Sequence, residues 1–423
     1  MRLIDYFDRG ADLYPDRHCL HDGTRGWTYA EVRGQTHRVA NGLLAAGLGS
    51  GSKAAVYSPN HAAAYACLLG IVRAGVTWAP VNARNALEEN LYILNNTDVE
   101  FLFYHSSFES SLPRIREACP KIREVACIDA PSFEVWLAAQ GEAAPDLPDD
   151  PDGVVFLASS GGTTGRPKGV QITNRNIETM NSIFWASMPV DRPPVHLMVA
   201  PMTHAAGVCS FPLLAFGGTN IFMGTADPGG ILAAIEKHGV THIYMPPTLI
   251  YMLLAHPDVR KHDYSSLTNL VYASAPMSVD KLVEAIEVFG PVLTQTYGQA
   301  EACMICTFFS PKDHVEALQT NKRHRLASCG RISPLVRLEV MDDQGKLLPR
   351  GERGEIVVRG GLVMAGYYNN PKATEEASAF GWHHTGDIGV IDADGFVYIV
   401  DRKKDMIISG GFNVFPSEVE QVL

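Results

Sequence analysis

The sequence predicts an α/β protein in which two helix-and-strand regions are followed by a smaller β-rich region. Short apolar runs alternate with helix-like patterns through about the first 330 residues, as in parallel sheets that are covered by helices. Hairpin patterns replace this alternation further along the chain. The chain of 423 residues exceeds what one simple core holds, and 46% hydrophobic with 19% charged residues is typical of a globular protein.

The N-terminal third begins with a helix signal. Thr28 and Glu31 have the spacing of a capping box, so we expect a helix that starts there and ends near Gly47. The segment 130–152 is rich in proline and acidic residues, which predicts a linker before a short buried strand at 154–158. The elements expected between these two landmarks are strands at 53–57, 75–81 and 99–104, and helices at 61–74 and 87–95.

A second alternating series and two hairpins follow, without an internal sequence repeat. The predicted series comprises strands at 195–200, 219–223, 240–245 and 267–273, and helices at 207–216 and 231–238. The predicted hairpins pair 336–341 with 354–359, and 388–391 with 396–400 across the turn 392–395.

Composition narrows the classes of partner and compartment. The formal net charge is −11 and there is no long basic run, which disfavours a nucleic-acid partner but allows a local basic pocket. We find neither a secretory signal nor a run of membrane-spanning length, so the cytoplasm is the expected compartment. Of the eight cysteines only Cys303 and Cys306 have C-x-x-C spacing, and we interpret all eight as reduced structural thiols.

The stretch from Ser159 to Val170 is the most informative part of the chain. Its glycines allow positive-φ backbone, so that successive N–H groups can converge on phosphate oxygens. Ser160, Thr163 and Thr164 add hydroxyl donors, and the loop follows a predicted strand end, where α/β sheets bind ligands. The spacing differs from that of a Walker A loop. We interpret the stretch as a phosphate cradle; a mobile surface linker is the alternative.

The run from Ser160 to Gly169 closely resembles the signature loop of the adenylate-forming superfamily, which includes acyl-CoA synthetases, amino-acid adenylation domains and beetle luciferases. Further matching motifs occur in the family's order along most of the chain. The resemblance implies two stacked α/β subdomains over about 1–330 and a small β-barrel-like subdomain over about 331–402, together an N-terminal domain spanning 1–402. The hinge and the start of a small C-terminal α+β domain are then expected at 403–423.

The resemblance also implies a nucleotide site. Tyr297 would stack on adenine and Glu301 would bind Mg²⁺, because a hard cation prefers carboxylate oxygen. In isolation this motif is equally compatible with an ordinary strand-to-helix turn, and Ala300 stands where the family commonly has threonine. The residues that we predict to bind nucleotide or CoA are Ser160, Gly161, Gly162, Gly165, Ser274, Ala275, Pro276, Gln295, Thr296, Tyr297, Gly298, Gln299, Asp387, Ile399, Arg402, Gly410 and Gly411.

The C-terminal motifs have family counterparts as well. The Thr-Gly-Asp turn that ends in Asp387 resembles the ribose-binding segment, although a plain turn would have the same sequence. By resemblance Arg402 touches the ribose and Lys404 is the hinge between domains. His383 and His384 have no metal-ligand neighbours in the sequence, so we interpret them as surface residues.

The acid pocket is predicted by resemblance alone. His204 resembles the residue that borders the pocket, whereas a lone histidine is otherwise a surface or core residue. No aspartate lies in this segment to hold an α-amino group, which argues against an amino-acid substrate. The apolar character of the candidates favours an aromatic or a medium to long aliphatic monoacid. The predicted pocket residues are His204, Val208, Cys209, Met245, Pro246, Ser274 and Met304.

The resemblance implies an ATP-dependent carboxylate:CoA ligase with ATP, Mg²⁺ and CoA as cofactor and cosubstrates. Two alternatives stay open: a ligase that loads a carrier-protein phosphopantetheine, and a nucleotide-binding homologue that has lost catalysis. A homodimer also stays open. Relatives carry a catalytic lysine beyond the position matching Leu423, so we expect this polypeptide to bind nucleotide but adenylate poorly. The predicted catalytic residues are Thr163, Thr164, Lys168, His204, Glu301 and Lys404.

Overall fold

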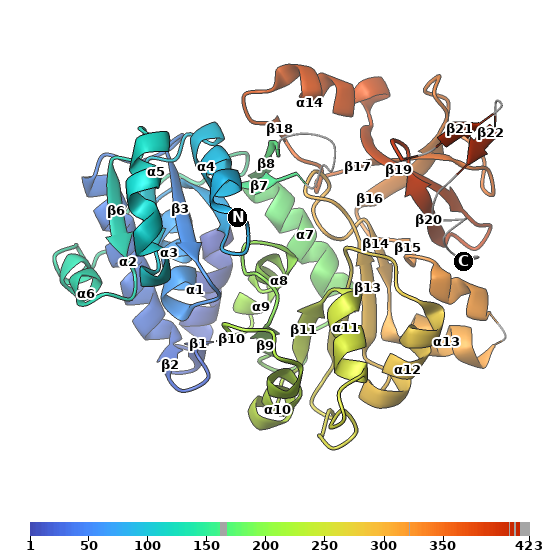
Figure 1. Ribbon diagram of the computed structural model, residues 1–423, viewed down its shortest axis with the longest axis horizontal. Helices are drawn as coiled ribbons and strands as arrows, with labels where there is room; N and C mark the ends of the chain where they lie inside the picture. Colours follow the sequence, from blue (N-terminus) through green and yellow to red (C-terminus); the bar gives the residue numbers. More distant parts are fainter. Residues whose placement is uncertain (161–166, 321, 406, 410–411, 415–423) are drawn as a thin grey trace.

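The computed structural model describes residues 1–160, 167–320, 322–405, 407–409 and 412–414. It contains two large mixed sheets covered by helices and a smaller antiparallel sheet (Figure 1). The prediction of an α/β protein with a small β-rich part is confirmed. Helix α7 (Asn174–Ser187) runs through the middle of the molecule, and its neighbours include α1 (Leu3–Leu13) and α9 (Phe211–Leu214).

The first large sheet has seven strands in the order β18-β8-β7-β4-β3-β5-β6. The five strands from β7 to β6 are parallel, and β8 and β18 are antiparallel to their neighbours. Parallel strands are covered on both faces, which explains why every residue of β5 is buried. The bounds are β3 Lys53–Ser58, β4 Thr77–Asn82, β5 Phe101–Tyr104, β6 Glu124–Cys127, β7 Val154–Ser159, β8 Gly169–Thr173 and β18 Gly366–Tyr367.

The second large sheet has nine strands in the order β15-β14-β13-β12-β11-β9-β10-β1-β2. Its centre is parallel, from β13 through β10 to β1. The edge strand β2 and its neighbour β1 come from the very beginning of the sequence. The bounds are β1 His18–His21, β2 Gly26–Thr28, β9 Val195–Met198, β10 Thr219–Phe222, β11 His242–Met245, β12 Asn269–Tyr272, β13 Leu293–Tyr297, β14 Thr307–Phe309 and β15 Arg331–Ile332.

The β-rich region is a four-stranded antiparallel sheet in the order β16-β17-β19-β20, so both predicted hairpins form. One short strand of the same region leaves it, because β18 pairs with β8 of the first large sheet. Strands β1 and β18 therefore each belong to a sheet whose other strands are mostly distant from them in the sequence. The bounds are β16 Val336–Met341, β17 Gly354–Gly360, β19 His383–Ile391, β20 Val397–Arg402, and a further hairpin of β21 Ile407–Ser409 with β22 Phe412–Val414.

The helices begin largely where the sequence predicts. Thr28 caps α2 through a capping box: the Glu31 N–H donates to Thr28 Oγ1, and the Thr28 N–H donates to Glu31 Oε2 at 2.6 Å. The remaining helices are α2 Tyr29–Ala45, α3 Ala62–Arg73, α4 Leu87–Asn96, α5 Leu112–Ala118, α6 Pro131–Ala138, α8 Ala205–Val208, α10 Pro228–His238, α11 Pro247–Leu254, α12 Val279–Phe289, α13 Pro311–Gln319 and α14 Pro371–Ala377, with 3₁₀ turns at Ser106–Ser111, Arg323–Ala327 and Ala379–Gly381.

The prediction of a linker at 130–152 was wrong for the first third of this segment, which forms α6. Phe133 and Leu137 are buried, and the Trp136 ring stacks on Phe133 while it contacts Phe103 of the first sheet. These aromatic contacts explain why a segment with prolines further along begins as a packed helix.

The prediction of a single helix at 207–216 was also wrong, because this region contains two separate short helices, α8 and α9. Pro212 has no N–H to donate to the Val208 carbonyl, so a continuous helix would lose a hydrogen bond there. The Ser210 hydroxyl donates back to the Gly207 carbonyl and satisfies the end of α8 instead.

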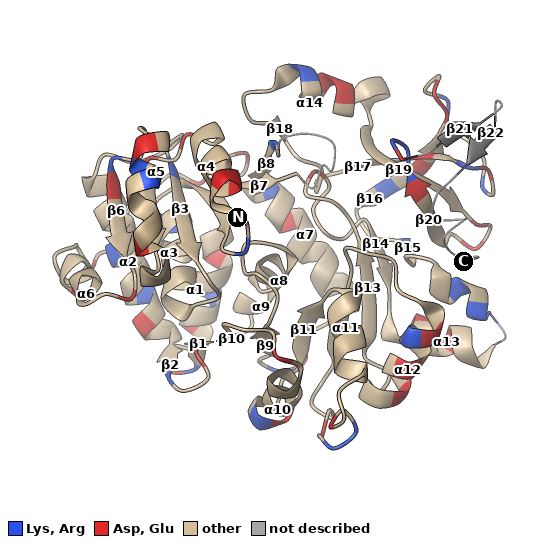
Figure 2. Ribbon diagram, in the orientation of Figure 1, with Lys and Arg blue, Asp and Glu red and all other residues tan. Residues whose placement is uncertain are grey.

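Acidic and basic side chains lie side by side on outer helices such as α5, α13 and α14 (Figure 2). All eight cysteines are free, and seven of them are buried. In the part of the chain that the structure describes, no helix has both the length and the apolar character needed to cross a membrane.

Candidate active site

A tight hairpin carries the loop rich in glycine and threonine. Ser159 of β7 lies opposite Gly169 of β8. Beyond that pair, the Ser160 N–H donates to the Lys168 carbonyl at 3.0 Å, and the Lys168 N–H donates to Ser160 Oγ at 2.9 Å. The hairpin therefore fixes the point from which the loop departs. The predicted cradle residues that lie outside the described residues are Gly161, Gly162, Thr163, Thr164 and Gly165.

A chain of contacts leads from this hairpin to the end of β13. Lys168 Nζ lies 4.6 Å from the ring centroid of Tyr367, and the Tyr367 hydroxyl donates to Glu301 Oε1 at 2.9 Å. Tyr367 reaches this position because β18 pairs with β8. Burial and the nearby Glu301 carboxylate raise the pKa of the Tyr367 hydroxyl, so it stays protonated and remains a donor. The structure thus brings Lys168 and Glu301 to the same place.

Asp387 of β19 is the centre of a second polar cluster. Only 2% of it is exposed. It accepts hydrogen bonds from the Tyr297 hydroxyl at 2.6 Å and from Gln299 Nε2 at 2.9 Å, and Arg402 Nε lies 2.9 Å from its other oxygen. Burial raises the pKa of this carboxyl, while the Tyr297 hydrogen bond and the Arg402 charge act in the opposite direction. A carboxylate accepts at about four sites, so this one retains the capacity to accept from a further donor.

The predicted site residues gather at one edge of the nine-stranded sheet. His204, Pro246, Ser274 and Gly298 follow β9, β11, β12 and β13, which are neighbouring parallel strands. The carboxyl ends of parallel strands meet at one edge, and that edge is where open α/β sheets bind ligands. Four separate sequence motifs are thereby brought together by the topology alone.

The turn after β12 has unusual backbone geometry. Ser274 has φ of 73° although it is not glycine, and its hydroxyl shares a 2.7 Å hydrogen bond with that of Tyr244. Ser274, Ala275 and Pro276 are exposed. A non-glycine residue in the left-handed region stores strain, and such residues concentrate at functional sites. Gln295, on β13 beside this turn, accepts a hydrogen bond from the Tyr272 hydroxyl.

No helix follows the motif around Tyr297. The chain turns back after β13 and returns as the antiparallel strand β14, and the Cys306 N–H donates to the Tyr297 carbonyl at 2.7 Å. Gly298 packs so closely under this turn that a Cβ would lie 2.5 Å from the carbonyl carbon of Met304. The alternative of a strand-to-helix turn is therefore not what the structure contains.

The interpretation of His383 and His384 as surface residues was wrong. His383 is 5% exposed, and burial lowers the pKa of its imidazole to about 4. His384 Nδ1 lies 3.0 Å from Glu355 Oε2, and the Gly386 N–H donates to the other oxygen of Glu355. Both rings lie in β19, which packs against β17, and the sequence pattern did not reveal this partner.

The segment after β20 is tied to the same carboxylate. Lys403 Nζ donates to Glu355 Oε2 at 3.1 Å and to Asp343 Oδ1 at 2.7 Å. Lys404, the predicted hinge residue, follows directly and is exposed. Ile399 lies in β20 opposite Gly389. The predicted residues Gly410 and Gly411 lie outside the described residues.

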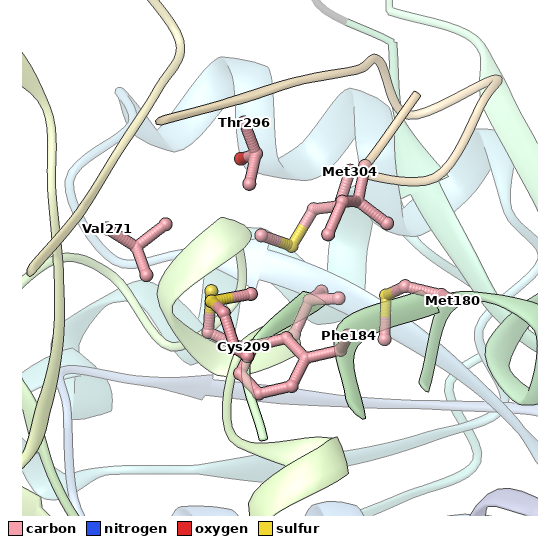
Figure 3. Close-up of a pocket in the computed structure, with 9 residues that line it drawn as sticks. Met180, Phe184, Cys209, Val271, Thr296 and Met304 are labelled. Carbon is pink, nitrogen blue, oxygen red and sulfur yellow. The ribbon is translucent and has the colours of Figure 1, made fainter. Parts of the chain in front are cut away.

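An apolar cavity lies beside the end of β13 (Figure 3). The Thr296 hydroxyl in its wall is buried and has no hydrogen-bond partner among the described residues. Of the predicted pocket residues, Val208, Cys209 and Met304 line the cavity, whereas His204, Met245, Pro246 and Ser274 do not. Its walls consist of Met180, Phe184, Met188, Val208, Cys209, Val271, Thr296, Met304 and Ile305.

Some of the cavity-wall residues lie outside the sequence motifs, but their spacing in the sequence could have identified them. Met180 and Phe184 are spaced four residues apart, which places them on one face of α7, and Met188 is the C-cap residue that follows the helix. His204 takes a different position: it stands at the N-cap position of α8 without a side-chain capping hydrogen bond and is exposed, and partial desolvation lowers the pKa of its imidazole.

The chemistry of the site suits a magnesium–triphosphate ligand. Glu301 offers a carboxylate, the ligand type that Mg²⁺ prefers, and phosphate oxygens and waters commonly complete its shell. Among the described residues there is no group of three or more His, Cys, Asp or Glu placed to hold a metal alone. A single carboxylate therefore fits a cation that arrives with a phosphate ligand.

The fold and this site define an adenylate-forming enzyme. The chain belongs to the AMP-binding enzyme family, whose model matches residues 7–368. It is 38% identical over 352 residues to the medium/long-chain-fatty-acid–CoA ligase FadD8 of Mycobacterium tuberculosis, covering 80% of this chain and 60% of that protein.

Two further similarities extend over almost the whole chain. It is 34% identical over 419 residues to feruloyl-CoA synthase of an Amycolatopsis species, covering 98% of this chain and 81% of that protein. The solved fatty acyl CoA synthetase of Mycobacterium tuberculosis superposes with a TM-score of 0.88 at 26% identity, covering 100% of this chain and 82% of that one. These proteins are thus longer than this chain, and the predicted resemblance is confirmed.

Proposed function

We propose that this protein is an ATP-dependent acid–thiol ligase that activates a carboxylic acid as its acyl-adenylate and then forms the acyl-CoA thioester. The observation that carries the proposal is the contact chain from Lys168 through Tyr367 to Glu301, beside the Asp387 cluster. It joins the base of the predicted phosphate loop to the Glu301 carboxylate, and Tyr297 and Gln299 of the same short segment hold Asp387, a buried acceptor suited to sugar hydroxyls.

The chemistry needs two displacements. In the first, a carboxylate oxygen of the acid attacks the α-phosphorus of ATP, and the bond to the β-phosphate breaks with release of pyrophosphate. In the second, the CoA sulfur attacks the acyl carbon, AMP leaves, and the thiol proton passes to solvent. A carboxylate is a poor electrophile, and the first step supplies the leaving group that the second step needs.

The described residues divide this work. Lys168 would offset phosphate charge, and Glu301 would hold Mg²⁺, which supplies further charge neutralisation when bound. Asp387 and Arg402 would orient the ribose, so that the α-phosphorus meets the acid at the carboxyl ends of the strands. Thr163 and Thr164, which lie outside the described residues, would add hydroxyl donors to the terminal phosphates.

The segment around Lys404 would let one cavity serve both steps. Lys403 is fastened to Glu355 and Asp343, so a rotation that begins after it would leave the nucleotide cluster in place. Domain closure of this kind commonly exchanges the groups around a reacting centre. We propose that residues 403–423 are this hinge and the start of a further domain, as the sequence implies.

We propose that the substrate is a monocarboxylic acid whose tail carries no charge and is either aromatic or aliphatic. No charged side chain lies among the described walls of the cavity. The similar proteins include one named for an aromatic acid, a feruloyl-CoA synthase, and one named for aliphatic acids, a fatty-acid–CoA ligase. The second candidate is a ligase that delivers the acyl group to a carrier-protein phosphopantetheine, which the same adenylate would serve.

The test has two stages. Calorimetry measures whether this chain binds ATP with magnesium, and acid-dependent exchange of labelled pyrophosphate into ATP measures adenylation by the product of the complete gene. Absence of exchange with a broad panel of acids, while ATP still binds, would leave only the nucleotide-binding alternative. Mass analysis of products with CoA or a carrier protein then identifies the thiol acceptor.

A further inference from the structure

Met304 occupies a strained turn at the end of the cavity. The Ile305 N–H donates to the Cys303 carbonyl at 2.8 Å, and Met304 between them has φ of 61°. A hydrogen bond from residue i+2 to residue i around a positive φ is the rare form of the γ-turn, which L-residues adopt only at a steric cost. Glycine would adopt it without that cost, yet methionine is present.

The surrounding backbone holds this turn from several sides. The Cys303 N–H donates to the Leu362 carbonyl at 3.1 Å, and the Cys306 N–H donates to the Tyr297 carbonyl at 2.7 Å. On a third side, Gly298 leaves no room between itself and the Met304 backbone. A costly conformation persists only where its surroundings fix it, and its usual place is a functional site.

The turn directs the Met304 side chain into the apolar cavity. Figure 3 shows Met304 above the cavity, with its side chain extended over Phe184 and Cys209. The free space inside is about 10 Å³, which is about one water-sized sphere. No acid tail fits until a wall side chain moves.

Met304 is the wall residue best suited to move. Phe184, Met180 and Cys209 are buried at the back of the cavity, whereas Met304 is only partly buried. Methionine has three rotatable bonds and a polarisable sulfur, so it adapts to an occupant more readily than branched or aromatic residues. The space that it vacates on rotation is limited to the volume of one side chain.

We propose that Met304 is a specificity-determining residue that restricts this enzyme to acids with a compact, uncharged tail, such as a single aromatic ring or a short branched chain. The inference rests on the proposed ligase function. The tail takes the place of the Met304 thioether against Phe184 and the sulfur atoms of Met180 and Cys209. A long straight chain exceeds the space that one side chain leaves, and a second carboxylate finds no partner on the described walls.

Three variants at this position test the inference. Met304→Ala removes the side chain, Met304→Gly removes it and relieves the strain, and Met304→Leu keeps an apolar side chain of similar volume. Adenylation kcat/KM is measured by pyrophosphate exchange, in the same protein that tests the proposed function by exchange, for benzoate, cinnamate, butyrate, octanoate and dodecanoate. Wild type should favour the compact acids, and the Ala and Gly variants should raise the ratio of dodecanoate to benzoate at least tenfold. Met304→Leu should keep the wild-type order.

A stability measurement separates the turn from the pocket. Met304→Gly should melt at a higher temperature than Met304→Ala, because glycine adopts the positive φ without steric cost. A wild-type preference for dodecanoate, or the same acid order in all four proteins, would overturn the inference while leaving the ligase function intact. Absence of exchange with every acid in wild type would instead refute the proposed function.

Discussion

The polar and apolar sides of the candidate site are built in opposite ways. Around Asp387 the buried carboxylate already has three donors, and Tyr367 holds Glu301. Around Met304 the cavity is filled by its own wall. If the proposed roles hold, the polar side, which would bind the nucleotide, is organised before a ligand arrives, whereas the apolar side, which would bind the acid, has to be opened. Pre-organised groups bind at a lower entropic cost, so the two sides should respond differently to substitution.

The largest effect is expected at Asp387. Asp387→Ala removes the acceptor that we propose for the ribose and takes away the carboxylate partner of the Tyr297 hydroxyl, while Gln299 Nε2 keeps its hydrogen bond to the Thr385 carbonyl. We expect ATP binding to weaken by about 100-fold, equivalent to about 2.7 kcal/mol, as measured by calorimetry. Asp146→Ala, at an exposed position in the proline-rich segment, is the control. Equal affinity in the two variants would contradict a nucleotide role for Asp387.

His383 gives a test of pH dependence beneath the polar side. Burial, and then the nearby His384, lower its pKa from 6.5 to about 4. Between these values the unfolded chain binds more protons, so stability falls as pH falls below about 6.5. Wild type should lose unfolding free energy between pH 7 and pH 5, and His383→Gln should reduce this loss by up to about 2 kcal/mol. Urea unfolding at both pH values measures it, and an unchanged difference between wild type and variant would contradict the burial of a neutral ring.

The neighbouring tyrosines 367 and 368 form a matched pair. Tyr367→Phe removes the donor to Glu301, and we expect about a tenfold loss in kcat/KM for ATP, equivalent to about 1.4 kcal/mol. The Tyr368 hydroxyl instead bonds to Asp98 and accepts from Lys53, remote from Glu301 in the contact network. Tyr368→Phe should therefore lower the unfolding free energy by about 1 kcal/mol and leave kcat/KM unchanged. Identical kinetic losses in both variants would show that the Tyr367 hydrogen bond is only structural.

The smallest effect is expected on the apolar side. The Thr296 hydroxyl is buried, without a partner among the described residues, and Thr296→Val replaces it with a methyl group of similar shape. We expect the unfolding free energy to rise by about 1 kcal/mol, because an unsatisfied buried hydroxyl is costly. Thr296→Ser keeps the hydroxyl and loses the methyl group, so it should be less stable than wild type. A destabilised valine variant would mean that the hydroxyl has a partner in solution.

The sequence predicts the strands and turns around the polar side well because their signals are local. Gln295 to Glu301 form one continuous motif at a strand end, and the capping box at Thr28 reports a helix start within four residues. Hairpins such as β16–β17 are equally local, since turn and strands are consecutive. These patterns depend on neighbours in the chain, which a sequence displays directly.

The apolar side depends on contacts between distant segments, and prediction was poorer there. The cavity walls come from α7, α8, β12, β13 and the segments next to them, which no local pattern joins. On the polar side, His383 was mispredicted for a similar reason, because its partner strand β17 lies more than twenty residues earlier. Helix α6 was missed for the same reason: its aromatic residues find their partners in β5.

The placement of β1 beside β10 has a consequence for biosynthesis. His18–His21 leaves the ribosome early, yet the strand that it joins, Thr219–Phe222, follows about 200 residues later. At typical translation rates that interval is about 10–40 s. Throughout it β1 lacks its parallel partner, so this strand waits longer for its place in a sheet than strands that pair with a close neighbour in the sequence.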